Sequence, residues 1–525
     1  VGGAPLGIVL AASWSGVLSV EEIAGEMRRD LDFAAVEMAD VPERQRSLRA
    51  AFNHSWRLLD ESERAIFSRL SVFRGGFTRE AAAAVAGATL HDLLALANKS
   101  LLTRASRGRF DLHDLLRHFA ETRLQEPDQV EATRLAHARY FLDLAKDAET
   151  RYTGAEQALA LNSLEAERHN LNVALQWALD RGNWEAAAEL AASLAEFWII
   201  RGYLADGRSW YDKVLAHREK ISPTTLATVL FAAGRLAFEG EDYRAAKTLF
   251  ADSLALWRET DQHRRIAALL IELGRAVEKE GDYGSAIACY EESLARFRKL
   301  DDRSGAAKVL HRLGFVAQLM GDYATATTRT EDALALRREL DERRGMASSL
   351  NALAEIARTQ GDYERARRLY EESLSLCREL GDKRCVAGVS HNMGHIATYQ
   401  GHYKFAAASF ERGFRLYQEL DSRLGIVLCL AGMAGVWTAR GRAERAARLL
   451  GATAKQIDDR RVLLDPADKL AWQQNLERTQ AQLDHETFQE AWSIGRTLSL
   501  DEALREAMID GDWRLPGRTA PPRPG

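Results

Sequence analysis

The chain has 525 residues, of which 28% are charged and only 9 are proline, and its formal net charge is −5. This profile is typical of packed helices with charged outer faces, and the length allows two to four domains. The slight negative charge gives no overall attraction to nucleic acid or to an anionic membrane, so any contact with DNA would have to be local.

No apolar run is long enough to span a bilayer, and there is no secretory signal. The cysteines are scattered without CxxC spacing, so we expect buried small hydrophobic residues rather than ligands or disulfides. This usage fits a reducing cytoplasm best. The cysteines are Cys289, Cys377, Cys385 and Cys429.

Residues 1–58 are expected to be helical, with helices opening at Pro5 and Ser19 and a third around residues 48–58. Because Val1 stands inside an apolar helix without a cap, we expect the native chain to continue upstream. This segment is therefore interpreted as part of a larger domain.

Residues 59–126 show three helical segments, over 61–70, from Thr78, and over 90–98. Two short strands, 101–104 and 109–112, and a closing helix follow, an order that predicts a winged-helix domain. The candidate recognition helix, 90–98, offers little base-reading chemistry, so no direct contact with nucleic acid is expected.

Residues 127–223 are expected to form a helical linker, 224–455 a regular repeat array, 456–512 a helical cap of its open end, and 513–525 a disordered tail. Four columns recur every forty residues and predict stacked helical hairpins. They are a Tyr column (203, 243, 283, 323, 363, 403), a small-residue column (234, 274, 314, 354, 394, 434), an Ala column (246 to 446) and a mostly aromatic column (250 to 450).

Gly-Asp-Tyr turns at Gly281, Gly321 and Gly361 predict where each hairpin folds, and Asp261, Asp301, Asp341, Asp382 and Asp421 are expected to cap helices between hairpins. The pattern Leu273-Gly274…Ala286…Tyr290 resembles the tetratricopeptide repeat, although the period is forty rather than thirty-four. The fold class is therefore all-α, a right-handed α-solenoid.

In tetratricopeptide arrays the first helix of each hairpin lines the concave side, which implies a groove for a peptide, protein or small-molecule inducer. The alternative is that these residues are simply solvated polar side chains. Carried onto this chain, the groove residues are Arg235, Arg275, His311, Asn351, Glu355, Arg358, His391 and His395.

Two short motifs at the amino end, Gly3-Ala4-Pro5-Leu6 and Leu112-His113-Asp114, resemble those of STAND or NB-ARC signal-transduction ATPases of the bacterial regulator type. The resemblance implies that residues 1–58 end a truncated nucleotide-binding module. It also implies that Pro5 packs on adenine and that His113 reaches the β-phosphate of ADP. The alternative is that Leu112 is buried, His113 faces solvent and Asp114 is only a first-turn acid.

The phosphate-binding loop Gly-x4-Gly-Lys-Ser/Thr is absent, so ATP or ADP would bind only with an upstream domain, and we expect no catalytic residue, no metal site and no enzyme activity in this chain. The predicted function is the regulatory and sensor portion of a STAND-type switch that controls nucleotide exchange and oligomerisation, in transcription or signalling. The alternative is an interaction scaffold without a nucleotide role.

Overall fold

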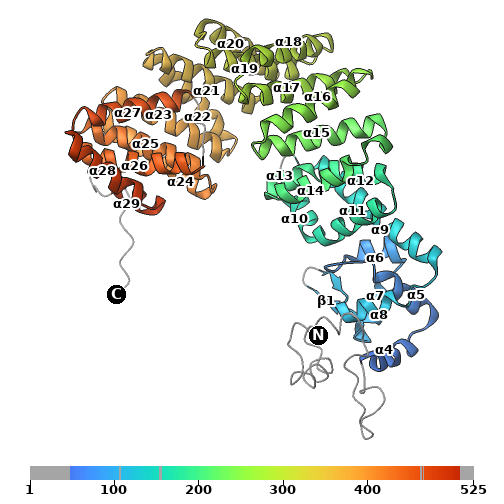
Figure 1. The fold of residues 1–525 in the computed structure, drawn as a ribbon. Coiled ribbons are helices and arrows are strands. Elements are labelled where there is room, and N and C mark those ends of the chain that lie inside the picture. Colours follow the sequence, from blue (N-terminus) through green and yellow to red (C-terminus); the bar gives the residue numbers. More distant parts are fainter. Residues whose placement is uncertain (1–47, 106–107, 153–155, 461–463, 465, 509–525) are drawn as a thin grey trace, which may run out of the picture. The chain divides into compact units, whose positions relative to one another are not determined.

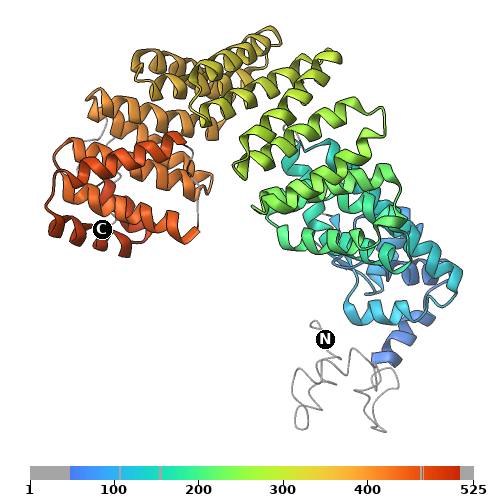
Figure 2. The ribbon, with the colours of Figure 1, turned by 45° about the horizontal axis from the view of Figure 1, so that its top comes forward.

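The computed structural model describes residues 48–105, 108–152, 156–460, 464 and 466–508, which form two compact units, residues 1–261 and 262–525. Pro5 and the expected helices at Pro5 and Ser19 lie outside the described residues. Figures 1 and 2 show the helices of residues 263–460 stacked in sequence order. Within the described residues no single helix is long and apolar enough to cross a membrane. One sharply bent pair of helices, Arg79–Ala86 and Leu90–Asn98, passes that test together, by length and composition alone.

The first unit begins with short helices and a small hairpin and continues as longer helices. Its elements are α4 (Leu48–Arg57), α5 (Glu61–Leu70), α6 (Arg79–Ala86), α7 (Leu90–Asn98), β1 (Thr103–Arg104), β2 (Phe110–Asp111), α8 (Asp114–Glu121), α9 (Pro127–Thr150), α10 (Gln157–Ala166), α11 (Arg168–Asp180), α12 (Trp184–Ser193), α13 (Ala195–Arg201), α14 (Leu204–Leu215), α15 (Pro223–Glu239) and α16 (Tyr243–Arg258).

The segment interpreted as a winged helix has the expected order of helices, hairpin and closing helix. Asp60 and Glu63 form a capping box at α5, and the Thr78 hydroxyl caps α6. The strands are shorter than expected because Leu101 and Leu112 turn into the core, and Phe77 bridges to Phe110 beside the hairpin. One apolar core runs on from Leu59 to Leu236, so this segment shares its core with the helices that follow.

The second unit is an array of helical hairpins followed by three further helices. Its elements are α17 (His263–Lys279), α18 (Tyr283–Lys299), α19 (Arg303–Leu319), α20 (Tyr323–Glu339), α21 (Arg343–Thr359), α22 (Tyr363–Glu379), α23 (Lys383–Tyr399), α24 (Tyr403–Glu419), α25 (Arg423–Ala439), α26 (Ala443–Arg460), α27 (Pro466–Gln480), α28 (His485–Thr497) and α29 (Leu500–Met508).

The sequence columns become the contacts inside each hairpin. The Ala column and the mostly aromatic column are buried, for example Ala286 and Tyr290 at 0% exposure. A Cβ placed on Gly274 would lie 2.6 Å from the Tyr290 ring, so the small column is what lets the second helix approach the first. The Ser293 hydroxyl adds a 2.7 Å hydrogen bond to the Ala267 carbonyl across the same pair of helices.

The turns follow the expected chemistry within hairpins but not between them. Gly281, Gly321 and Gly361 adopt the left-handed conformation, and the Asp that follows each glycine accepts a hydrogen bond from a first-turn amide of the next helix. Between hairpins, Asp382 caps α23 as expected.

The expectation that Asp261 caps α17 is wrong, because the N-cap residue of that helix is Gln262. The expectation that Asp301, Asp341 and Asp421 cap helices is also wrong. These three residues have φ between 49° and 52°, so they occupy the left-handed position that glycine takes inside the hairpins. The cap of α19 is the next residue, Asp302, whose side chain accepts from the Gly305 amide.

The expectation that the cysteines form no disulfide is wrong for one pair. Cys377 in the last turn of α22 and Cys385 in the first turn of α23 form a disulfide, with Cα atoms 5.6 Å apart. The repeat brings these two turns together although the sequence shows no motif there. Cysteine usage therefore gives no reason to assign a reducing compartment. Cys429 is a buried free thiol, as expected.

Candidate functional site on the first helices of the array

The candidate groove residues divide into two sets. Arg235 belongs to the first unit and forms an ion pair with Glu196. In the second unit, Arg275 pairs with Glu272 at 2.6 Å, and His311 Nε2 lies 3.3 Å from the Ser348 hydroxyl. These three side chains are engaged by neighbouring residues.

The other five residues come from α21 and α23 of adjacent repeats, and two of them, Asn351 and Glu355, are bonded by an amide of α23 that the sequence analysis missed. The Asn392 side chain on α23 donates to Asn351 at 3.2 Å and to Glu355 at 3.1 Å, both on α21. Asn351 also donates to Glu355 at 2.8 Å. Asn392 is 7% exposed. In the sequence, its position next to the candidate residue His391 was the signal that could have identified it.

Helix α27 covers this face of the array, lying beside α23 and α25 in Figure 1. His391 Nε2 is 3.4 Å from an Asp468 carboxylate oxygen, the Tyr399 hydroxyl donates to Gln474 at 3.0 Å, and the Asn475 amide donates to the Ala431 carbonyl at 3.1 Å. These contacts join residues more than forty positions apart.

The expected groove is therefore not open at its carboxy-terminal end, where the structure corrects the prediction for one arginine and two histidines. Arg358, His391 and His395 are only 7%, 4% and 5% exposed, because the carboxy-terminal segment folds back over them. Sequence periodicity places these side chains on the first helices but carries no information about what packs on top.

Arg358 borders a polar cavity of about 220 Å³ between α21 and α27. Its Nη1 is buried and has no hydrogen-bond partner. The neighbouring Tyr363 and Tyr399 rings stack with centroids 5.4 Å apart. Burial alone would lower the pKa of Arg358, but Tyr370, Asp468 and Glu355 outweigh it and raise that pKa. The cavity thus holds a permanent positive charge with an unused donor.

The histidine pair and Asp468 form a second cluster on the same face. The His391 and His395 rings meet edge to face with centroids 4.7 Å apart. Burial, with a smaller contribution from His391, lowers the pKa of His395 well below its usual value, so this ring is neutral. Burial would raise the pKa of Asp468, but the hydrogen bond and charge of His391 lower it to about 2.

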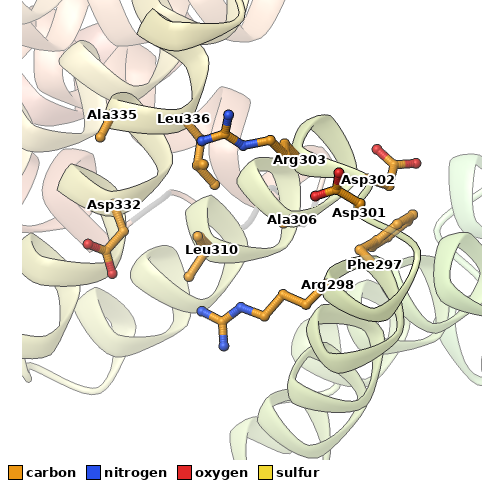
Figure 3. A pocket seen from close by; sticks show the side chains of 10 residues that line it. All are labelled: Phe297, Arg298, Asp301, Asp302, Arg303, Ala306, Leu310, Asp332, Ala335 and Leu336. Atoms are coloured by element: carbon orange, nitrogen blue, oxygen red, sulfur yellow. The ribbon is translucent and has the colours of Figure 1, made fainter.

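A larger cavity of about 480 Å³ lies between α18, α19 and α20 and is drawn in Figure 3. Two of its charged groups already have structural roles, since Asp302 caps α19 and Arg303 forms an ion pair with Glu339. No residue of the candidate groove lines it. We therefore place the candidate site at the Arg358 cavity instead.

His113, the candidate phosphate ligand, caps α8 in the first unit. Its Nδ1 accepts a hydrogen bond from the Leu115 amide at 3.2 Å, and Asp114 pairs with Arg117 at 2.6 Å. Leu112 is 4% exposed and His113 is half-buried. Leu112 is thus buried and Asp114 is an acid of the first helical turn, as the alternative to a nucleotide role expected. Of the two His113 ring nitrogens, Nε2 is the one that a ligand could contact.

The fold defines a helical-repeat protein, and comparison with known sequences agrees. The tetratricopeptide-repeat family matches residues 225–299, 265–339, 305–379 and 345–419. These residues are tandem tetratricopeptide repeats, as the forty-residue columns predicted.

Curated relatives come from Mycobacterium tuberculosis and Mycobacterium bovis, and their names class them as candidate HTH-type transcriptional regulators. Each is 31% identical over 242 residues, which covers 43% of this chain and 27% of the relative. The chain thus spans about a quarter of the length of these relatives.

Two solved structures are similar at low identity. A STAND signal-transduction ATPase with a tetratricopeptide-repeat sensor, from Pyrococcus horikoshii, has a TM-score of 0.44 at 15% identity, covering 89% of this chain and 74% of that protein. NprR in complex with its cognate peptide NprX has a TM-score of 0.39 at 15% identity, covering 55% and 83%.

Proposed function

We propose that this chain is the regulatory and sensor portion of a STAND-type ATPase switch, and that its repeats bind an inducer. The observation that carries the proposal is the Arg358 cavity, where a buried guanidinium keeps an unpartnered Nη1 beneath a helix of the same chain. A buried donor without a partner is costly, and a ligand would satisfy it. The inducer would be a peptide, a protein segment or a small molecule.

The chemistry of the cavity favours an inducer that carries a carboxylate. The Arg358 guanidinium has a fork of donors that suits a carboxylate, and the Gln474 and Tyr399 side chains add polar groups at the cavity wall. Ala467, Leu470 and Ala471 of α27 also line the cavity, so a ligand larger than the cavity would have to shift this helix. Inducer binding would in this way be coupled to a change in the array.

The nucleotide half of the proposal concerns the first unit. An imidazole at the start of α8 suits a phosphate, because a helix amino terminus favours an anion, and His113 would hold the β-phosphate of ADP through its Nε2. Pro5 would pack on the adenine. Release of His113 would permit exchange of ADP for ATP and oligomerisation. The chain itself would have no enzyme activity.

The names of the mycobacterial relatives support transcription as the output of the switch. The alternative function is an interaction scaffold, in which the repeats assemble partners and His113 only caps α8. The hydrogen bond from the Leu115 amide to His113 favours this alternative for the amino-terminal part.

The two functions differ in what His113→Ala does in the native protein, expressed with any residues that precede Val1. In the switch, the variant loses bound ADP, measured by chromatography of nucleotide released from the purified protein, or becomes constitutively active. The matched control is His91→Ala, an exposed histidine of α7, which leaves nucleotide content unchanged. Equal ADP content in His113→Ala and the parent protein would leave the scaffold as the function.

A further inference from the structure

We propose that His391, His395 and Asp468 form a binding site for a divalent transition-metal ion, with Zn²⁺ as the best fit, and that the ion fastens α27 to the array. The ligand atoms of these three residues all lie within 4.8 Å of one another. The proposal stands apart from the inducer and nucleotide functions, because it requires neither.

The two histidines are separated by one helical turn on α23, which places both rings on one face of the helix. Asp468 comes from the first turn of α27. Its carboxylate oxygen is 3.4 Å from His391 Nε2. Two ligand atoms that are each about 2.0 Å from a tetrahedral Zn²⁺ are about 3.3 Å apart, so this pair already has the spacing of two zinc ligands.

The ligand set selects the class of metal. Two imidazole nitrogens and one carboxylate suit Zn²⁺ and related transition metals, whereas Mg²⁺ and Ca²⁺ prefer oxygen ligands alone. The site is also sheltered, since His391 and His395 are 4% and 5% exposed. Three protein ligands leave the fourth coordination position of a tetrahedral ion for water or another donor.

Cys429 acts as a positioning residue. Its Sγ lies 3.8 Å from Nδ1 of His391, the ring nitrogen that faces away from Asp468. A partner on the second nitrogen fixes the ring orientation and the tautomer of a metal-bound histidine. Glu355 and Arg358 also stand near the cluster, and Asp468 interacts electrostatically with Arg358 as well as with the two histidines.

The test is metal binding by the whole 525-residue chain after chelator treatment. Competition with a chromophoric chelator should show one saturable Zn²⁺ site, and Co²⁺ should give the visible absorption of a low-symmetry site, while Mg²⁺ should not compete. His391→Gln, His395→Gln and Asp468→Asn should each abolish this site. Cys429→Ser should weaken it about 10- to 100-fold. The matched control is His485→Gln, an exposed histidine of α28, which should bind like the parent.

Asp468→His separates a metal site from a simple ion pair between α23 and α27. This variant removes the carboxylate but supplies a third imidazole, so it should still bind Zn²⁺, and Zn²⁺ should slow hydrogen exchange in α27. Circular dichroism of each variant establishes that it is folded. Absence of Zn²⁺ binding to the parent chain, or binding that survives His391→Gln, His395→Gln and Asp468→Asn alike, would overturn the proposal.

Discussion

Single residues set how closely the helices of a repeat approach. Gly274 shows this most directly, because a Cβ there would lie 2.6 Å from the Tyr290 ring. The ring cannot withdraw easily, since it is fully buried and its hydroxyl donates a 2.8 Å hydrogen bond to Glu278. The small-residue column is therefore a packing requirement, and the sequence alone was sufficient to predict it.

Gly274→Val should lower the free energy of unfolding by about 2–3 kcal/mol, because overpacking forces the ring and the backbone to shift. The control is Gly284→Val in the neighbouring helix α18, where a Cβ meets nothing closer than 3.8 Å. Urea denaturation followed by circular dichroism gives both midpoints. Equal midpoints for the two variants would contradict the packing role of Gly274.

A buried histidine in the first unit predicts how stability responds to acid. His137 is 1% exposed and packs against the rings of Phe73 and Phe141. Burial, with the nearby charge of Arg74, lowers its pKa to about 3, so the folded state holds the ring neutral. The unfolded chain binds a proton at about pH 6.5, so stability from this residue is complete above that pH and falls as the pH decreases toward 3.

Between pH 6.5 and pH 5 this single residue should cost about 2 kcal/mol of unfolding free energy, at about 1.4 kcal/mol per pH unit. His137→Gln removes the titrating group, so its stability should depend less steeply on pH over this range. Urea denaturation at several pH values measures both slopes. The same slope in the parent and in the variant would show that His137 does not titrate on unfolding.

At the scale of elements, local chemistry was readable where a turn has its own sequence signature. Gly-Asp-Tyr predicted the start of α18, α20 and α22, because a left-handed glycine followed by a capping Asp leaves few alternatives. The role of Asp301 was predicted wrongly because Asp can serve either as an N-cap or as a left-handed residue. Only the backbone conformation shows which role it takes.

The helices predicted to cap the array, within residues 456–512, are a second example. The sequence pattern predicted that these helices form but not what they pack against. Helix α28 packs on α26 and Gly495 lies against the Arg448 backbone, as a capping helix should. Helix α27 instead packs on α25 and α26 and is hydrogen-bonded to His391 and Tyr399 of α23. Nothing in its composition distinguishes a helix that covers an open end from one that covers a groove, because both bury one apolar stripe.

At the scale of the molecule, the candidate site depends on contacts that no local signal reports. His391 and Asp468 are 77 positions apart, and the Arg358 cavity has walls from both α21 and α27. The sequence analysis found Arg358, His391 and His395 through their repeat positions, but it missed Asp468, Asn392 and Cys429. The carboxy-terminal segment therefore forms part of the candidate site.

The covering helix can be tested through its closest approach to the array. A Cβ on Gly435 of α25 would lie 2.5 Å from the Asn475 side chain of α27, and Asn475 is 4% exposed and bonded to the Ala431 carbonyl. A leucine at position 435 has no space while α27 is in place, so Gly435→Leu should displace α27 and leave the repeats folded. Ala439→Leu, at the exposed end of the same helix, is the control.

Displacement should expose the histidines that α27 covers. In the parent chain, His391 and His395 should resist modification by diethylpyrocarbonate, and amides of 466–480 should exchange slowly. In Gly435→Leu both histidines should become reactive and these amides should exchange quickly, while α23 keeps its protection. If the two histidines react equally in the parent chain and in Gly435→Leu, α27 does not close the groove in solution. An inducer could then contact Arg358 without displacing a helix.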